Sequence, residues 1–364
     1  MKAVQLTGHG DMDKLVYRED VPIPEPGADE VRITVHACGM NNTDVWVRQG
    51  AYGTETDPDA VSTWQRGEST LEFPRIQGTD IVGAIDRVGA NVDSSRIGER
   101  VMVDFSIYNR PEGDDSLADI DYIGHGRDGG YAEYVTVPAS HAYQTDADLA
   151  DAELATFCCA YMTAEHLLDR AHVAAGERVL VTGASGGVGS GLIQLVRARD
   201  AIPYAVTSSG KADEIHSIGA EAAVLRDTDG DLVDKVDEAT GGEPIDVVAD
   251  LVGGPMFNDL LRILRPEGRY TTSGAIAGPV VELDLRTMYL KHLQLNGSSQ
   301  GTRSAFRRVL QYIEQGRIKP LLAGTYKLSD FKAAQQAFMD KKHVGNLVVV
   351  PDAQWQEYGA PHAA

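Results

Sequence analysis

The sequence has few cysteines, an excess of acids over bases, and no long apolar run. Three cysteines in 364 residues cannot form a disulfide framework, so we expect a reducing compartment, the cytoplasm. No stretch of about 18 apolar residues occurs, which excludes a predicted membrane-spanning helix. The opening residues, Met-Lys-Ala-Val-Gln-Leu, are typical of a first strand and not of a signal peptide.

Basic residues are scarce, because 33 lysines and arginines face 54 acids and leave a net charge of −21. Such a field repels nucleic acids and anionic membranes, so we expect neither as a partner. The acids are spread along the chain, which indicates a solvated acidic surface as in proteins that work at high salt. An acidic cytosolic enzyme would show the same pattern. The length is sufficient for two domains, each with its own core.

The most informative stretch is Val-Leu-Val-Thr-Gly-Ala-Ser-Gly-Gly-Val-Gly, residues 179–189. An apolar strand leads into a glycine turn, the turn opens a helix, and a second strand follows about twenty residues on, which is the order of a dinucleotide-binding unit. In the G-x-G-x-x-G pattern, Gly186 lets the backbone approach a pyrophosphate and Gly189 lets the helix pack closely on the strand. The first N–H groups of the helix then face the phosphates. The predicted cofactor-binding turn consists of Ala184, Ser185, Gly186, Gly187, Val188 and Gly189.

The end of the second strand bears on which cofactor is bound. NAD sites usually carry an acid there, which holds the ribose hydroxyls and would repel a 2′-phosphate. This chain has Thr207 in that place, followed by Ser208, Ser209 and Lys211. Hydroxyls and one ammonium suit a phosphate, so NADP(H) is predicted. A polar loop that merely caps the next helix would have the same composition.

The chain divides into regions of different pattern. Residues 1–140 are typical of short strands between turns, apart from a polar stretch over 108–130 that predicts a long surface loop. A predicted helix over 151–171 leads into an alternation of strands and helices. The predicted strands are 179–182, 204–207, 222–225, 245–250, 269–273 and 293–297. This alternation predicts an α/β fold with a doubly wound parallel sheet.

Several motifs resemble those of the medium-chain dehydrogenase/reductase superfamily over nearly the whole chain. They are Met1-Lys-Ala-Val, Gly39-Met-Asn-Asn-Thr-Asp44, Gly78-Thr-Asp-Ile-Val-Gly83, Gly98-Glu-Arg-Val101, Gly129-Gly-Tyr-Ala-Glu133, Thr163, the glycine turn and Gly345-Asn-Leu-Val-Val349. The resemblance implies a GroES-like, mainly-β catalytic domain formed by 1–142 and 303–364. It implies a Rossmann dinucleotide-binding domain over 143–302 and an active site in the cleft between the two.

The resemblance also assigns residues to the site. Thr163 stands where relatives contact the nicotinamide, and Gly253, Gly274 and Asn346 complete the predicted cofactor site. The last strand, 293–297, would end the Rossmann sheet as an apolar edge that a twofold partner covers, so a homodimer is predicted.

Zinc-dependent members of this superfamily use a Cys, a His and a later Cys as ligands. Those positions hold Asn41, Thr79 and Cys159 here. An amide and a hydroxyl replace a thiolate and an imidazole poorly, so we expect no catalytic zinc. Zinc-bearing relatives place four close cysteines in the loop 104–130, and this loop has none, so no structural zinc is expected either. Without a metal, nothing polarises an alcohol oxygen, which disfavours alcohol oxidation.

The pattern Asn41…Asp44…Gly50-x-Tyr52 resembles the quinone oxidoreductase and enoyl reductase branch. The resemblance implies hydride transfer from NADPH to a quinone, an enone or an enoyl thioester. These small-molecule acceptors are already electrophilic, so the protein must orient them and donate a hydrogen bond to the developing charge. Tyr52 is the candidate donor, and Asn41 the candidate for orienting the substrate or the nicotinamide ribose. Tyr52 could equally pack at a loop end, Asn41 could belong to a turn, and Arg48 is expected in solvent.

Two other functions are compatible with parts of the sequence. One is an NAD(P)-dependent alcohol or sugar dehydrogenase with an atypical zinc site. The other is a protein that keeps the nucleotide fold but acts on RNA or as a scaffold, which the intact glycine turn and the net charge disfavour.

Overall fold

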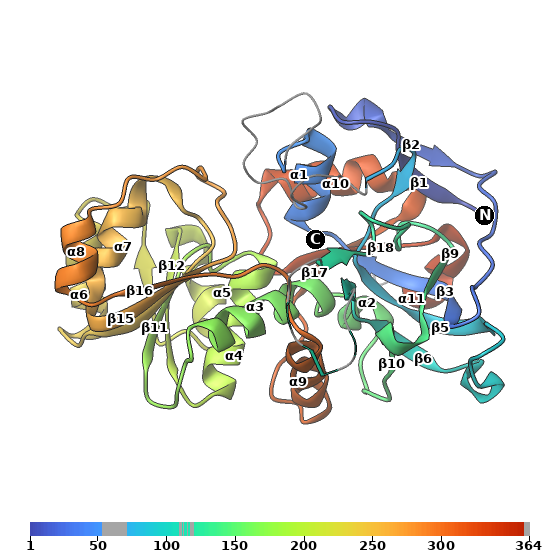
Figure 1. Cartoon of the computed structure of the whole chain (residues 1–364). Coiled ribbons are helices and arrows are strands. Elements are labelled where there is room, and N and C mark those ends of the chain that lie inside the picture. Colours follow the sequence, from blue (N-terminus) through green and yellow to red (C-terminus); the bar gives the residue numbers. More distant parts are fainter. Residues whose placement is uncertain (53–70, 109–110, 112, 115, 117–119, 360–364) are drawn as a thin grey trace. The chain divides into compact units, whose positions relative to one another are not determined.

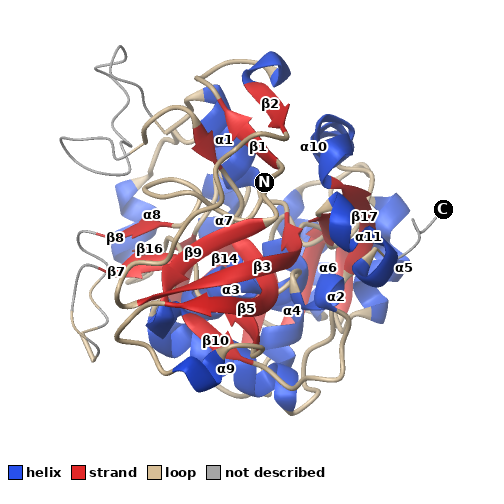
Figure 2. Ribbon diagram, turned by 90° about the vertical axis from the view of Figure 1, so that its right-hand side faces the viewer, coloured by secondary structure: helices blue, strands red, loops and turns tan. Residues whose placement is uncertain are grey.

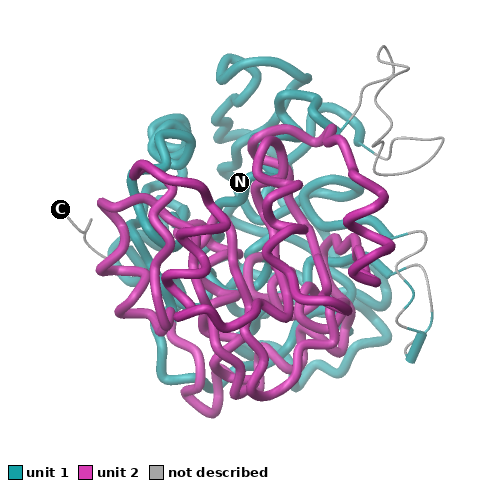
Figure 3. Tube along the Cα trace, turned by 90° about the vertical axis from the view of Figure 1, so that its left-hand side faces the viewer, with its two compact units in different colours: residues 1–159, 320–364 teal, residues 160–319 magenta. Residues whose placement is uncertain are grey.

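The computed structural model describes residues 1–52, 71–108, 111, 113, 114, 116 and 120–359. The chain forms two compact units, shown in different colours in Figure 3. Unit 1 comprises Met1–Cys159 and Pro320–Ala364, and unit 2 comprises Ala160–Lys319. These bounds differ from the predicted domain limits at 142/143 and 302/303. The units change over near the start of α3 (Cys158–Arg170) and after α9 (Arg303–Glu314).

Unit 1 is built on a mainly antiparallel sheet, whose strands are red in Figure 2. The sheet has seven strands in the described residues, in the order β10–β6–β5–β3–β18–β17, with β9 also pairing with β3. The strands are β3 (Glu30–Gly39), β5 (Asp80–Val88), β6 (Arg100–Val103), β9 (Tyr134–Pro138), β10 (Ala142–Gln144), β17 (Leu322–Lys327) and β18 (Asn346–Val350). β18 pairs antiparallel with β3, and Val348 lies opposite Gly39. The last part of the chain therefore completes the sheet begun by its first part.

Smaller elements surround this sheet. The strands β1 (Ala3–Leu6), β2 (Leu15–Arg18) and β4 (Arg75–Ile76) form a second sheet, and the helices are α1 (Asn42–Gln49), α2 (Asp151–Leu154), α10 (Phe331–Asp340) and α11 (Trp355–Tyr358). The predicted loop 108–130 is not wholly a surface loop. Its residues Ile120–Tyr122 form β8, which pairs with β7 (Ser106–Tyr108), and Ile120, Tyr122 and Ile123 are buried. Three residues are too short a run to show a strand period in a polar sequence.

Unit 2 is a parallel sheet flanked by helices, and the expected Rossmann-type fold is confirmed. Six strands of the described chain follow the order β13–β12–β11–β14–β15–β16, and every neighbouring pair is parallel. They are β11 (Arg178–Val181), β12 (Ile202–Thr207), β13 (Ala222–Leu225), β14 (Ile245–Asp250), β15 (Leu264–Thr272) and β16 (Gln294–Gly297). The helices are α4 (Gly187–Ala198), α5 (Ala212–Ser217), α6 (Leu232–Thr240), α7 (Phe257–Ile263), α8 (Leu285–Leu290) and α9 (Figure 1).

Two predicted elements differ most from their predicted extent. The predicted helix 151–171 is two helices, α2 and α3. The strand predicted at 269–273 begins at Leu264, where the turn-like residues Arg-Pro-Glu-Gly concealed it and where the register with β14 shifts. The central strands of the sheet are apolar and buried, as in parallel sheets covered on both faces. No helix in the described ranges is long and apolar enough to cross a membrane.

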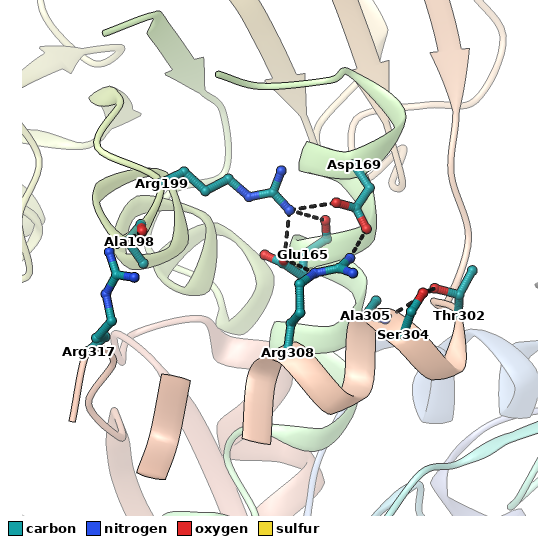
Figure 4. Close-up of polar contacts among 9 residues, drawn as sticks. All are labelled: Glu165, Asp169, Ala198, Arg199, Thr302, Ser304, Ala305, Arg308 and Arg317. Carbon is teal, nitrogen blue, oxygen red and sulfur yellow. Dashed lines mark hydrogen bonds and ion pairs between the residues drawn. The ribbon is translucent and has the colours of Figure 1, made fainter. Parts of the chain in front are cut away.

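Four charged side chains fix α3, α9 and the end of α4 to one another within unit 2 (Figure 4). Glu165 is fully buried, and its Oε1 accepts hydrogen bonds from Arg199 at 2.6 Å and Arg308 at 2.8 Å. Asp169 also accepts from both arginines. Because Arg308 lies on α9, these bonds tie α9 to unit 2, and no local pattern around residue 308 predicts that pairing.

Candidate functional site

The glycine turn of unit 2 leaves the start of a helix open. Gly186 is the N-cap of α4 and is exposed, and no side chain caps the helix. The first N–H groups of a helix have no partner within it, so they can bind an anion. A Cβ added to Gly189 would lie 2.2 Å from the Gly183 carbonyl oxygen, so only glycine allows α4 to pack this closely. The turn fits a pyrophosphate.

A buried carboxylate joins this turn to two neighbouring loops. Asp250, at the end of β14, is fully buried and accepts hydrogen bonds from the hydroxyls of Thr182 and Tyr270, both at 2.5 Å. It also accepts from the N–H of Gly253 at 3.1 Å. A Cβ added to Gly274 would lie 2.7 Å from the Leu251 carbonyl oxygen, so the loop carrying Gly274 lies directly against this one. The predicted residues Gly253 and Gly274 are thus brought together.

Sequence reasoning missed Thr182, Asp250 and Tyr270. A local sign existed, because Asp250 is a charged residue at the end of an otherwise apolar strand and is followed by Leu-Val-Gly-Gly. Only the pairing of β14 with β11 and β15 shows that its partners stand at the ends of neighbouring strands.

The ends of β12 and β13 carry both signs of charge. Ser209 is exposed, but its N–H and its hydroxyl both donate to Asp227 at 2.9 Å. Burial lowers the pKa of Lys211, and the neighbouring Arg226 also lowers it while Glu214 raises it. Ser208 is half-buried at the start of the same turn. The strand itself lacks an acid, as noted from the sequence, but the next strand brings one to Ser209.

Asn41 of unit 1 stands at the centre of a buried polar cluster. It is the N-cap of α1, and its backbone N–H donates to Asp44 Oδ2 at 2.8 Å. Its side-chain Nδ2 donates to Asp80 Oδ2 at 2.6 Å and to Thr79 Oγ1 at 3.1 Å. The side-chain N–H groups of Asn41 therefore donate hydrogen bonds to acceptors within the protein.

Asp80 connects this cluster to α3. Its Oδ1 accepts the backbone N–H of Cys159, so Asn41 and Cys159 meet at this carboxylate, while Thr79 is joined to it through Asn41. Burial raises the pKa of Asp80 to about 7, so its neutral and ionised forms are both populated near neutral pH. Burial likewise raises the pKa of Asp44 to about 6, against the hydrogen bond that it accepts from Tyr131 at 2.6 Å. The sequence alone did not predict that Asp80 accepts hydrogen bonds from both Asn41 and Cys159.

Tyr52 lies near this cluster. The residue is half-buried just after α1, and its ring meets Trp46 edge to face with centroids 5.8 Å apart. Its hydroxyl is hydrogen-bonded to Thr43, and Cys159 and Asp44 are close enough to influence its titration. Burial raises the pKa of Tyr52 to about 12, so the hydroxyl remains a donor at neutral pH.

Two further predicted residues have other surroundings. Thr163 is buried on α3 in unit 2. Asn346 is buried on β18 in unit 1, and its Nδ2 donates to the Thr156 carbonyl at 2.9 Å. The nicotinamide contact of Thr163 and the cofactor contact of Asn346 stay predictions.

Arg48 contradicts the expectation that it lies in solvent. Its side chain is buried, with Nε donating to Gln335 at 2.9 Å and Nη1 donating to the Gly10 carbonyl at 2.6 Å. The reason is tertiary, because these partners come from a loop near the N-terminus and from α10, which both pack on α1. Arg48 therefore holds local structure in unit 1.

Comparisons with known proteins agree with this architecture. A family model described as the alcohol dehydrogenase GroES-like domain matches residues 27–147, and one described as zinc-binding dehydrogenase matches 187–315. A crystal structure of a putative alcohol dehydrogenase from Sinorhizobium meliloti 1021 is 68% identical, with a TM-score of 0.93 and 97% of each chain covered.

Two curated relatives are reductases. An acryloyl-coenzyme A reductase of Sulfurisphaera tokodaii is 28% identical over 96% of this chain and 100% of the relative. A quinone oxidoreductase of Rattus norvegicus is 27% identical over 92% of each. With its GroES-like domain, its Rossmann-type sheet and these relatives, the chain belongs to the medium-chain dehydrogenase/reductase superfamily and is an oxidoreductase of the kind that uses a nicotinamide dinucleotide.

Proposed function

We propose that this protein transfers hydride from NADPH to a quinone or to an activated carbon–carbon double bond, in an enone or an enoyl thioester, without zinc. The observation that carries the proposal is the buried cluster around Asp80, where an amide and a hydroxyl stand at two of the positions that hold metal ligands in zinc-dependent relatives. The similarity to an acryloyl-coenzyme A reductase and to a quinone oxidoreductase supports it.

The donor set of this cluster does not fit zinc. Asn41 turns N–H groups toward Asp80 and Thr79, and an N–H donor has no lone pair for a metal. Among the residues that the structure describes, no group of three or more His, Cys, Asp or Glu side chains is placed to hold a metal ion. The proposed reaction therefore does not involve zinc.

In this proposal, different residues bind the cofactor, donate a hydrogen bond to the substrate and shape the site. The start of α4 and the 208–211 turn hold the cofactor's phosphates, with Ser208 and Lys211 toward the 2′-phosphate. The cofactor supplies the hydride when it is bound. Tyr52 donates a hydrogen bond to the substrate oxygen as negative charge develops on it. Asn41, fixed by Asp80 and Thr79, shapes the wall of the site.

The test is NADPH oxidation by the purified protein with quinones, enones, enoyl thioesters and aldehydes, at low and at high salt. Turnover of at least one quinone or activated alkene, with no zinc bound per chain by elemental analysis, is the expected result. A protein that reduces only aldehydes and carries zinc would overturn the proposal.

A second candidate is an alcohol or sugar dehydrogenase with an atypical zinc site. The similarity to the Sinorhizobium meliloti protein, described as a putative alcohol dehydrogenase, favours it. Alcohol-dependent NAD(P) reduction that a chelator abolishes and added zinc restores would establish this activity. If the protein is instead the proposed reductase, a chelator should not change its rate of NADPH oxidation.

The cofactor preference is expected to be NADPH over NADH. Lys211→Ala removes an ammonium beside Ser208 and Ser209, so we expect the Kd for NADPH to rise at least tenfold and that for NADH to change less than twofold. Titration of tryptophan fluorescence with each cofactor measures both values. Equal affinity of the native protein for the two cofactors would contradict this expectation.

A homodimer through the last Rossmann strand is also proposed. In the described residues β16 pairs only with β15, so its other edge is open. Exposed apolar side chains lie close before it in sequence, among them Val280, Leu285 and Leu290. We expect a dimer by light scattering, and a shift toward monomer in Leu290→Asp. The control Ile97→Asp changes an exposed apolar residue of unit 1 and should remain dimeric; a native monomer at all concentrations would refute the proposal.

A further inference from the structure

The turn after β12 and the turn after β13 are held side by side. The two strands are parallel, and Thr207 lies opposite Leu225. The backbone N–H of Arg226 donates to the Thr207 carbonyl at 2.9 Å, so the pairing continues one residue beyond the strand. Arg226 and Asp227 are thereby placed next to the turn that runs from Ser208 to Lys211.

Asp227 is tied to that turn by its carboxylate. Its oxygens accept the Ser209 N–H at 2.9 Å and the Ser209 hydroxyl at 2.9 Å. These hydrogen bonds, together with the nearby Arg226, hold the pKa of Asp227 below its usual range. The carboxylate therefore carries a full negative charge at neutral pH.

Charges of both signs lie close together at this place. Lys211 and Arg226 are close enough for one to influence the titration of the other, and Asp227 lies between the two strand ends with the opposite sign. The whole chain has a net charge of −21, so local cations such as these matter for binding an anionic cofactor.

We propose that Asp227 determines how strongly the cofactor site distinguishes a 2′-phosphate from a 2′-hydroxyl. Its carboxylate fixes the Ser209 turn by hydrogen bonds, and its charge offsets part of the attraction that Lys211 and Arg226 exert on a phosphate. The inference rests on the proposed binding of NADP(H). It adds a selectivity residue from the turn after β13, and not from the end of the strand that usually carries the deciding acid.

The test compares two fragments of the cofactor, 2′,5′-ADP and 5′-AMP, by isothermal titration on the full chain. Asp227→Asn keeps an oxygen acceptor for Ser209 and removes the charge. The ratio of the Kd for 5′-AMP to the Kd for 2′,5′-ADP is expected to rise about fivefold at low ionic strength, the scale of an exposed charge pair, and the rise should vanish at about 1 M salt.

Asp229→Asn is the matched control, since it removes the same charge from the same exposed loop two residues further on. Its ratio should stay within twofold of the native value. The inference is overturned if Asp227→Asn behaves as Asp229→Asn does, or if its effect persists at high salt. The underlying NADP(H) proposal fails separately, if the native protein binds 2′,5′-ADP no more tightly than 5′-AMP.

Discussion

Tyr52→Phe is expected to lower kcat about 100-fold on an enone or an enoyl thioester, equivalent to about 3 kcal/mol of transition-state stabilisation. The substitution removes one hydroxyl and keeps the ring that packs against Trp46. KM should rise much less, because the hydrogen bond strengthens only as the enolate charge develops. Steady-state kinetics with saturating NADPH measures both constants.

A quinone provides the internal control for Tyr52. Its reduction leaves a delocalised anion that water solvates easily, so the loss of kcat should be clearly smaller on this acceptor. Because burial raises the pKa of Tyr52 to about 12, the hydroxyl stays protonated through the neutral range and the ratio of the two kcat values should not vary there. An equal small loss on both acceptors would assign Tyr52 to packing.

Glu165→Gln is expected to destabilise unit 2 by about 3 kcal/mol, because it leaves two arginines around a buried site with only one carboxylate between them. The side chain is fully buried, and its Oε1 serves both Arg199 and Arg308. Its Oε2 has no hydrogen-bond partner among the described residues, so the new amide cannot gain one there without rearrangement. Urea unfolding followed by circular dichroism measures the change.

Asp169→Asn is the matched control for this network. Asp169 contacts the same two arginines, but a third of its side chain is exposed and water compensates the lost charge. We expect about 1 kcal/mol for this variant. Equal losses in the two variants would show that burial of Glu165 does not govern the energetics of the network.

The fold could be predicted where its signals are local. A buried strand, a glycine turn and a helix start follow one another directly at 178–198. The close contact that requires glycine at position 189 is with Gly183, only six residues earlier in the sequence. The alternation of strands and helices likewise determined the parallel sheet. The strand β15 was cut short because turn-forming residues lie inside it, and β8 was missed because it is so short.

The candidate site was harder to predict from the sequence, because its contacts join segments that are far apart in the chain. Asp80 was not recognised as the residue where Asn41 and Cys159 meet, since these three residues are far apart in sequence and only the fold of unit 1 brings them together. Asp227 reaches Ser209 through the pairing of two strands. Arg48 was expected in solvent for the same reason, as nothing within its own helix indicates the partners that bury it.

The pairing of β18 with β3 also sets an order of events during synthesis. β3 leaves the ribosome early, but its partner β18 follows only after every residue of unit 2 has been made. Unit 2 is continuous in sequence, so all of its strands are available to pair while unit 1 still lacks an internal strand of its sheet. Before β18 is made, β9 can already pair with Glu30–Thr34 of β3, so the part of this edge that waits for β18 is its end at Cys38 and Gly39.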